Sequence, residues 1–284
     1  MYKLSAFFKI IGFLSLIIVC FYGTNEAILV VREMDDLLIE IKEKSNDYVK
    51  NAKPAIIKGD TIIPGITGLK VNVNKSYLKM KEYGKFNENL IVYEKLKPDD
   101  LLHNNLDKYI ISGNPEKRMV SLIFLVNNND EIDKIRDILK NKKVSATFFL
   151  DGEYVESHLD QISDIKLEGH TLGNYSYNKD YNNSSFVWVD TIFKRLGNQD
   201  NNYCITLKKN KDVLKNCSLH HDYTIVPDIY TFKEPLGNIK KNVKNGSLIA
   251  LESNNEIELS LSTIISYLKS KGYKLVNLET ILSE

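Results

Sequence analysis

Apolar runs and helix-like segments alternate along the second half of the chain. The runs at 119–126 and 144–152 are short and almost wholly apolar, as in buried strands, and each precedes a segment with helical spacing. Strands that alternate with helices predict a parallel sheet with helices outside it. About seven such repeats favour an open or distorted (β/α) barrel whose site lies at the C-terminal ends of the strands. The fold class expected for 118–284 is therefore α/β.

The other elements expected in this region follow the same rhythm. Helices are expected at 130–143, 154–169, 185–198, 211–221, 234–246 and 256–272. Further strands are expected at 170–176, 203–209, 223–230 and 247–253, and the segment 273–282 closes the chain.

A region rich in turn residues precedes the repeats. Turns are indicated at Pro54, Gly59, Pro64, Gly65 and Gly68. Strands are expected at 69–74 and 89–96, with a short helix between them that Asn74 caps and Gly84 ends. These signals predict a small α+β accessory module over 51–117.

The N-terminal segment 1–25 has the features of a signal anchor. Lys3 and Lys9 precede an apolar run from Ile10 to Tyr22, which together with Leu4 to Phe8 approaches the roughly 20 residues needed to span a bilayer. No convincing cleavage site follows it, so an uncleaved single-pass anchor with the body outside the cytoplasm is expected. A secreted form, or one lipidated at Cys20, remains the alternative. Residues 26–50 are expected to form a juxtamembrane helix.

The composition is that of a folded globular protein. The chain has 284 residues, of which 43% are hydrophobic and 26% charged. Its formal net charge of +1 gives no reason to expect a nucleic-acid partner.

Several segments resemble the NodB-type polysaccharide deacetylases. The sequences VSATFFLDG at 144–152 and GHTLGN at 169–174 carry the resemblance, which extends in order over 118–284. It implies a distorted (β/α) barrel that removes acetyl groups from N-acetylglucosamine-type glycans such as peptidoglycan or chitin. It also implies a divalent metal held by one Asp and two His, with an Asp as general base and a His as general acid.

The residues that this chemistry needs are missing from the first two motifs. Where the family has T-F-D-D, Leu125 stands at the position of the base and Val126 at that of the metal-binding Asp. Where the family has H-T-x-x-H, Tyr175 and Lys179 replace both histidines. A lysine ammonium repels a metal cation rather than binding it.

The later motifs are degenerate as well. The segment 203–209 lacks the family's Arg and Pro, and Glu252 or Ser253 stands where the acid His would follow a strand. Without a metal the pKa of a bound water cannot be lowered. The sequence therefore predicts a catalytically inactive relative, with no catalytic residue, no metal site and no cofactor.

Polar and aromatic side chains are nonetheless expected around the former active site. A retained glycan cleft would use Asn127, Asn174, Tyr175, Tyr177, Lys179, Asp228 and Glu252. The rival interpretation is a filled pocket, with Leu125 and Val126 inside it and a protein partner on the outer face. The sequence leaves both open, so the expected partner is cell-wall glycan or an envelope protein.

Two further functions remain as alternatives. An active metal-dependent deacetylase would need a rearranged site that still binds its metal. A purely structural interaction protein would use residues 26–117 to hold its partner.

The remaining candidate residues have simpler explanations. His170 is expected to be structural, and Asp151 is expected to cap a helix rather than touch a ligand. His103 and His158 are isolated, and His220 and His221 end a helix.

Cys204 and Cys217 form a candidate disulfide outside the cytoplasm. Two buried free thiols are the preferred interpretation, because sequence alone does not bring the two Cα atoms together.

Overall fold

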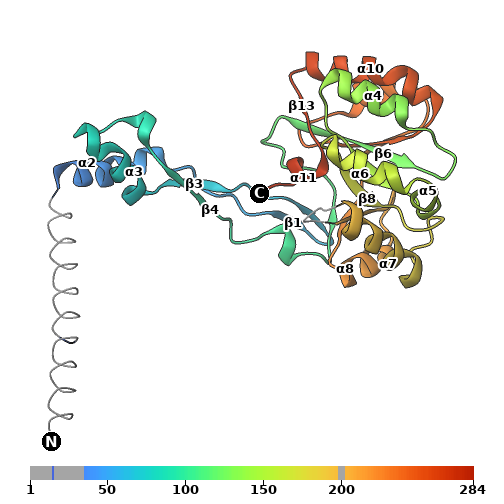
Figure 1. The fold of residues 1–284 in the computed structure, drawn as a ribbon, viewed down its shortest axis with the longest axis horizontal. Coiled ribbons are helices and arrows are strands. Elements are labelled where there is room, and N and C mark those ends of the chain that lie inside the picture. Colours follow the sequence, from blue (N-terminus) through green and yellow to red (C-terminus); the bar gives the residue numbers. More distant parts are fainter. Residues whose placement is uncertain (1–14, 16–34, 198–201) are drawn as a thin grey trace, which may run out of the picture. The chain divides into compact units, whose positions relative to one another are not determined.

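The computed structural model describes residues 15, 35–197 and 202–284, which fall into two units (Figure 1). One unit comprises Met1–Ala52 and Thr67–Leu96, and the other comprises Lys53–Ile66 and Lys97–Glu284. The accessory module predicted over 51–117 is thus divided between them. The predicted anchor lies outside the described residues, except for Ser15. Among the described residues, no helix is long and apolar enough to cross a membrane.

The first unit packs two helices and a two-stranded sheet around a small core. Its elements are α2 (Asp36–Lys44), η1 (Ser45–Tyr48), β3 (Gly68–Val71), α3 (Val73–Met80), η2 (Lys81–Tyr83), η3 (Glu88–Leu90) and β4 (Tyr93–Leu96). Strands β3 and β4 are antiparallel. The core consists of Leu37, Leu38, Ile41, Val71, Tyr77 and Met80.

Side-chain caps fix both helices of this unit. Asp35 accepts hydrogen bonds from the backbone N–H groups of Leu37 and Leu38 at the start of α2. The Tyr77 hydroxyl donates to Asp35 over 2.8 Å, which links α3 to α2 and lowers the pKa of Asp35. The predicted cap of α3 was misplaced, because β3 ends at Val71 and Asn72 therefore caps the helix.

The second unit is built on a long, mostly parallel sheet. Its strands are β1 (Ile56–Lys58), β2 (Thr61–Ile63), β5 (Tyr109–Ile110), β6 (Met119–Val126), β7 (Thr147–Leu150), β8 (Thr171–Asn174), β9 (Tyr203–Ile205), β10 (Tyr223–Ile225), β11 (Ile229–Thr231), β12 (Leu248–Glu252) and β13 (Lys274–Leu275). The strand order is β1-β2-β5-β10-β9-β8-β7-β6-β12-β11, and β13 also pairs with β6. Only the β1–β2 pair of this sheet is antiparallel among the described residues.

Helices cover the outer face of this sheet, which curls into a half-barrel (Figure 1). They are α4 (Asp133–Lys142), α5 (Gly152–Ser157), α6 (Leu159–Leu167), α7 (Asn183–Ile192), α8 (Lys211–Leu219), α9 (Pro235–Asn242) and α10 (Asn255–Ser270), with the short helix η5 (Phe193–Gly197). The helices α11 (Leu278–Ile281) and η4 (Leu102–Asn104) instead place Leu278, Ile281 and Leu102 in the hydrophobic cluster inside the curl. The predicted α/β class is confirmed.

The central strand β6 separates two hydrophobic layers. Because side chains alternate along a strand, Phe124 and Val126 join the layer between the sheet and the helices. Ile123 and Leu125 join the layer inside the curl. All of β6 except Met119 is buried, which explains its unbroken apolar sequence.

Two predicted elements are each split in the structure. The helix expected at 154–169 breaks at His158, whose ring stacks on Tyr154 with centroids 4.1 Å apart. The strand expected at 223–230 forms β10 and β11, which lie at different places in the strand order. Pro227 lies between them and has no N–H to donate to a strand neighbour.

A disulfide joins β9 to α8. Cys204 and Cys217 are bonded, with Cα atoms 6.4 Å apart, and both residues are fully buried. The preference for two free thiols was therefore wrong, because α8 packs directly against the strands on either side of it.

Two buried carboxyl groups, Asp190 on α7 and Asp222 after α8, lie side by side. Asp190 accepts a hydrogen bond from Asn174 Nδ2 over 2.9 Å, and the Asp222 carboxyl group interacts with Asp190 and with the Asn202 side chain. Burial, together with the neighbouring Asp190, raises the pKa of Asp222 to about 9. One of the two carboxyl groups therefore keeps a proton at neutral pH.

This pair predicts that the protein loses stability as pH rises. The native state holds a proton that the unfolded chain releases near pH 4, so the free energy of unfolding falls between about pH 4 and 9, by at most about 1.4 kcal/mol per pH unit. Asp222→Asn is expected to remove this contribution and to be more stable than the wild type at pH 8. Urea unfolding at several pH values measures the difference. Asp137→Asn on the exposed face of α4 is the control, and parallel pH profiles for wild type and Asp222→Asn would contradict the prediction.

Candidate functional site

Two hollows lie side by side where β6 and its neighbouring strands end. The first, here called the aromatic hollow, has a volume of about 360 Å³ and is lined by Asp130, Tyr230, Phe232, Glu252, Ser253 and Asn254. The second, the asparagine hollow, has a volume of about 400 Å³ and is lined by Asn127, Asn128, Asn129, Asp130, Asp151, Asn178 and Lys179. Asp130 belongs to both, so the two hollows form one candidate site.

Apolar packing lies where the resemblance places the catalytic base. Leu125 is fully buried and belongs to the inner hydrophobic cluster together with Phe149 and Tyr175. Gly173 makes room for this packing, because a Cβ atom there would lie only 2.4 Å from the Phe149 ring. The interior of the former active site is therefore filled.

The four replaced positions do not form a metal site. Val126 points into the outer cluster, away from Tyr175 in the inner one. The Lys179 ammonium lies 5.4 Å from the centre of the Tyr175 ring. Burial raises the pKa of Tyr175 well above its usual value, so its phenol stays neutral. Nowhere in the described chain do three or more His, Cys, Asp or Glu residues come together as a metal site. The metal of the deacetylases does not fit these residues.

The aromatic hollow contains residues that the sequence did not single out. Tyr230 lies on β11 and Phe232 lies directly after this strand, and their ring centroids are 6.0 Å apart. The Tyr230 hydroxyl donates to Glu252 Oε1 over 2.7 Å. Burial and this hydrogen bond raise the pKa of Tyr230 to about 12. Strand β11 runs parallel to β12, which brings this aromatic pair to Glu252.

Asp130 was predicted only as the beginning of a helix, yet it joins the two hollows. Its Oδ2 accepts hydrogen bonds from the backbone N–H of Asn127 at 2.7 Å and from its amide group at 3.1 Å. Burial raises the pKa of Asp130, although these two bonds act in the opposite direction. The turn after β6 thus presents a partly desolvated carboxyl group.

Three of the predicted cleft residues lie elsewhere. Asn174 is buried and donates to Phe186 O and Asp190, so it fixes α7. The Tyr177 hydroxyl donates to Glu156 on α5, outside both hollows. Asp228 accepts from Ser247 and from the Leu248 backbone at the start of β12, the end opposite Glu252. Its placement on the rim of the cleft was wrong, since the chain enters β11 directly after it.

Asn127, Lys179 and Glu252 do line the hollows. Asp151 lines the asparagine hollow as well, but its side chain caps α5 by accepting from the Glu153 N–H, as predicted.

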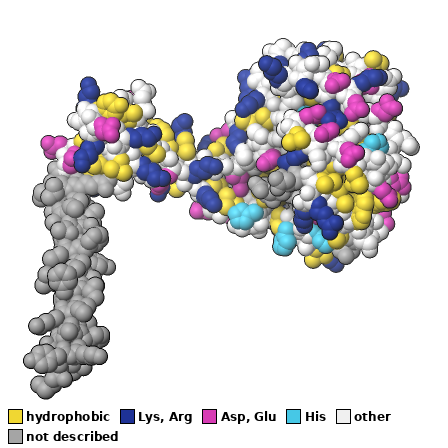
Figure 2. All heavy atoms as spheres, viewed as in Figure 1, with side chains coloured by type: hydrophobic (Ala, Val, Ile, Leu, Met, Phe, Trp, Pro, Cys, Tyr) yellow, Lys and Arg dark blue, Asp and Glu magenta, His cyan; other side chains and the backbone are white. Residues whose placement is uncertain are grey.

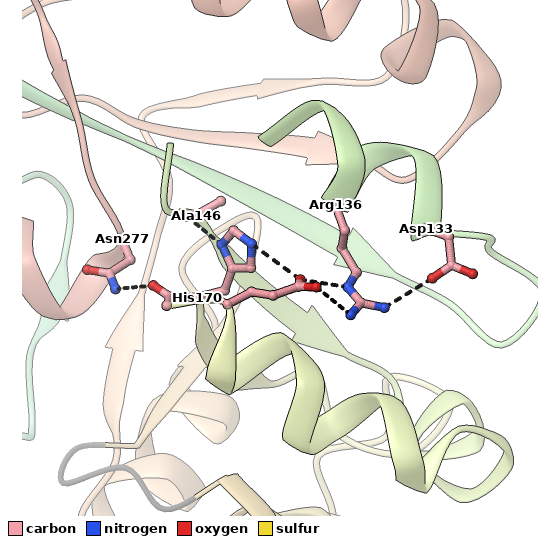
Figure 3. Close-up of polar contacts among 7 residues, drawn as sticks. Asp133, Arg136, Ala146, His170 and Asn277 are labelled. Carbon is pink, nitrogen blue, oxygen red and sulfur yellow. Dashed lines mark hydrogen bonds and ion pairs between the residues drawn. The ribbon is translucent and has the colours of Figure 1, made fainter. Parts of the chain in front are cut away.

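His170 has the structural role expected of it (Figure 3). Its Nδ1 accepts a hydrogen bond from the Ala146 N–H over 3.0 Å, which leaves the proton of the neutral ring on Nε2. Glu168 lies 3.8 Å from that Nε2 and forms a two-pronged hydrogen bond with Arg136. Burial lowers the pKa of His170 to about 4. This histidine lies before β8, at the end of the sheet opposite the hollows.

Comparison with known sequences identifies relatives of the same kind. A family model described as polysaccharide deacetylase matches residues 112–245. The chain is 30% identical over 283 residues to the uncharacterized protein YlxY of Bacillus subtilis, covering 92% of this chain and 88% of that protein. It is 28% identical over 114 residues to the peptidoglycan-N-acetylmuramic acid deacetylase PdaA of the same organism, covering 36% of this chain and 43% of PdaA.

Solved structures of similar proteins also superimpose on this chain. BA3943 of Bacillus anthracis, described as a CE4 family pseudoenzyme, superimposes with a TM-score of 0.68 at 25% identity, covering 88% of this chain and 96% of that one. A BA3943 mutant, described as having restored enzymatic activity, gives the same TM-score and identity over 88% of this chain and 99% of that one.

The filled interior predicts that Leu125 contributes strongly to stability. Leu125→Ala removes a fully buried side chain and is expected to lower the free energy of unfolding by about 2–5 kcal/mol. Leu259→Ala on α10, where the side chain is 74% exposed, is the matched control and should change it by less than about 0.5 kcal/mol. Denaturant unfolding measures both. A loss below about 1 kcal/mol for Leu125→Ala would show that this position is not packed as described.

Proposed function

This chain belongs to the polysaccharide deacetylase family, and we propose that it is a non-catalytic member that binds cell-wall glycan. One observation carries the proposal. At the mouth of the half-barrel lies a polar and aromatic cleft, while the positions that correspond to the catalytic base and the metal ligands are taken by Leu125, Val126, Tyr175 and Lys179. The cleft can hold a ligand, but it has no group arranged to activate water.

The likeness to BA3943 supports the loss of activity, since that protein is described as a pseudoenzyme of the same family. A mutant of that protein is described as having restored enzymatic activity, which supports the inference that catalysis can be lost in this family while the fold is kept. An active deacetylase with a rearranged site is the weaker alternative, because the described residues offer no ligand set for the metal. We place the body outside the cytoplasm, held at the membrane by residues 1–25, where it would meet the wall.

A second candidate function is the binding of an envelope protein. Hydrophobic side chains gather on the outer face formed by α5, α6 and α7 (Figure 2). The exposed large hydrophobic residues on α6, α7 and η5 are Leu159, Leu167, Val187, Trp188 and Leu196. A group of exposed apolar side chains is a common feature of protein interaction sites. This face is separate from the two hollows, so glycan and protein could be bound by different surfaces.

Binding without turnover is the expected behaviour on purified peptidoglycan. The wild-type protein should sediment with insoluble peptidoglycan and release no acetate, with or without added zinc or cobalt. Phe232→Ala should weaken sedimentation several-fold, because an aromatic ring at the hollow supplies contact area for a sugar face. Tyr83→Ala, which removes an aromatic residue 63% exposed in the first unit, is the matched control and should bind like the wild type.

The outcomes separate the candidate functions. Metal-dependent release of acetate would establish an active enzyme. Absence of sedimentation would remove glycan binding, and a protein partner on the face of α5, α6 and α7 would then become the better explanation.

A further inference from the structure

The aromatic hollow is acidic. Glu252 and Asp130 both line it, and none of the other described residues that line it is basic. Tyr230 occupies only Oε1 of Glu252, and Asn127 occupies only Oδ2 of Asp130. Within the described residues, each carboxyl group therefore retains an oxygen that a ligand's donor can use. Two partly buried carboxylates facing one space favour a positively charged ligand group.

Two aromatic rings stand beside these carboxyl groups. Tyr230 is 37% exposed and Phe232 is 55% exposed, which is unusual for side chains of this size. The hydrogen bond to Glu252 holds the Tyr230 ring in place. Asn254 donates from its amide to Phe232 O over 3.2 Å and caps α10, so the backbone behind the second ring is also fixed. The rings form a preformed apolar surface next to the two acids.

A third feature is an unused hydroxyl group. Ser253 lines the hollow and is only 5% exposed, and its Oγ has no hydrogen-bond partner in the described part of the chain. Its backbone N–H donates to Leu125 O over 3.1 Å, which fixes its position at the end of β12. A buried polar atom without a partner is rare in native proteins and indicates a missing partner such as a ligand. The hydroxyl of a sugar can both donate to and accept from this group.

We propose that the aromatic hollow binds a de-N-acetylated amino sugar of the glycan in preference to its acetylated form. The ammonium group would lie between Glu252 and Asp130 and the apolar sugar face against Phe232 and Tyr230. A ring hydroxyl would reach Ser253 Oγ, which is itself buried, after a rotation of that side chain toward the hollow. This inference rests on the proposed function and narrows it, because it names the product of a deacetylase rather than its substrate as the ligand. An acetamido group is neutral and would supply no counter-charge to Glu252, whereas Lys179 offers one to Asp130 from the asparagine hollow.

Other cationic ligands fit the hollow less well. The described residues bring no third acidic or imidazole ligand to the pair, as a divalent metal would need. A lysine side chain of a protein would satisfy the carboxyl groups, but it has no flat apolar face to cover two exposed rings. The volume of about 360 Å³ lies at the lower end of the range for small-ligand sites and suits one sugar unit of a longer chain.

Calorimetric titration of the full-length protein with matched disaccharides tests this assignment. The probes are the β-1,4 disaccharide of glucosamine and its N,N′-diacetylated form, at about pH 6, where the amino groups are protonated. The free disaccharide is expected to bind at least about tenfold more tightly. Glu252→Gln keeps the shape of the side chain and removes its charge, so it should abolish most of that preference, because a hydrogen bond to a charged group is worth about 1.5–3 kcal/mol.

Two controls keep the result specific. Asp137→Asn changes the net charge equally at an exposed site on α4 and should bind like the wild type. Ser253→Ala should weaken both disaccharides, because it removes a hydroxyl contact that does not depend on charge. Thermal unfolding of each variant verifies that it is folded.

The possible outcomes distinguish this inference from the proposed function. Equal or tighter binding of the diacetylated disaccharide would overturn the inference and leave glycan binding intact. Binding of neither disaccharide, together with no sedimentation on peptidoglycan, would overturn both. Displacement of the glucosamine disaccharide by a short lysine peptide at equal concentration would show that the hollow recognises an ammonium group alone, and would overturn the assignment to a sugar.

Discussion

The packing of Leu125 inside the curled sheet determines what the rest of the site can be. Leu125 on β6, Phe149 on β7 and Tyr175 directly after β8 belong to one buried cluster at the place where a metal hydrolase would hold water. Burying a charged group at this depth would cost several kcal/mol of desolvation free energy unless the group were paired or bound to a metal. With apolar side chains inside, the polar groups of the site lie near or just beyond the C-terminal ends of β6, β7, β8, β11 and β12.

Lys179 replaces a metal-binding histidine of the family and also determines the charge at the mouth of the half-barrel. Burial raises the pKa of Asp130, and the Lys179 ammonium, which lies over the Tyr175 ring, acts against that rise as a fixed positive charge on one side of Asp130. Glu252 lies on the other side and acts on Asp130 in the opposite direction. The two hollows share Asp130 but differ in charge, because Lys179 lines the asparagine hollow and Glu252 lines the aromatic hollow. A charged ligand that spans both would therefore bind in one orientation.

The sequence was sufficient for the alternating strands and helices of the half-barrel. It was insufficient for features that depend on tertiary contacts, such as the addition of β1, β2 and β5 to the same sheet. Apolar runs such as β6 and β7 were readable because both faces of a parallel sheet are buried. The break between α5 and α6 at His158 could not be predicted, because it depends on stacking against Tyr154 within an otherwise helical pattern. The Cys204–Cys217 disulfide was undecidable from spacing, since it requires α8 to pack on β9.

The sequence also predicted only some residues of the candidate site, because the others depend on the topology of the sheet. Leu125 and Glu252 could be placed because each lies near the C-terminal end of a recognisable strand, and Lys179 because it lies in the loop after β8. Tyr230 and Phe232 could not, because β11 follows β10 in the chain yet pairs with β12 at the other end of the strand order. That same crossing moves Asp228 away from the cleft. Because packing fixes the interior while these loops supply the rim, the ligand preference of this fold can change at the rim without loss of the half-barrel.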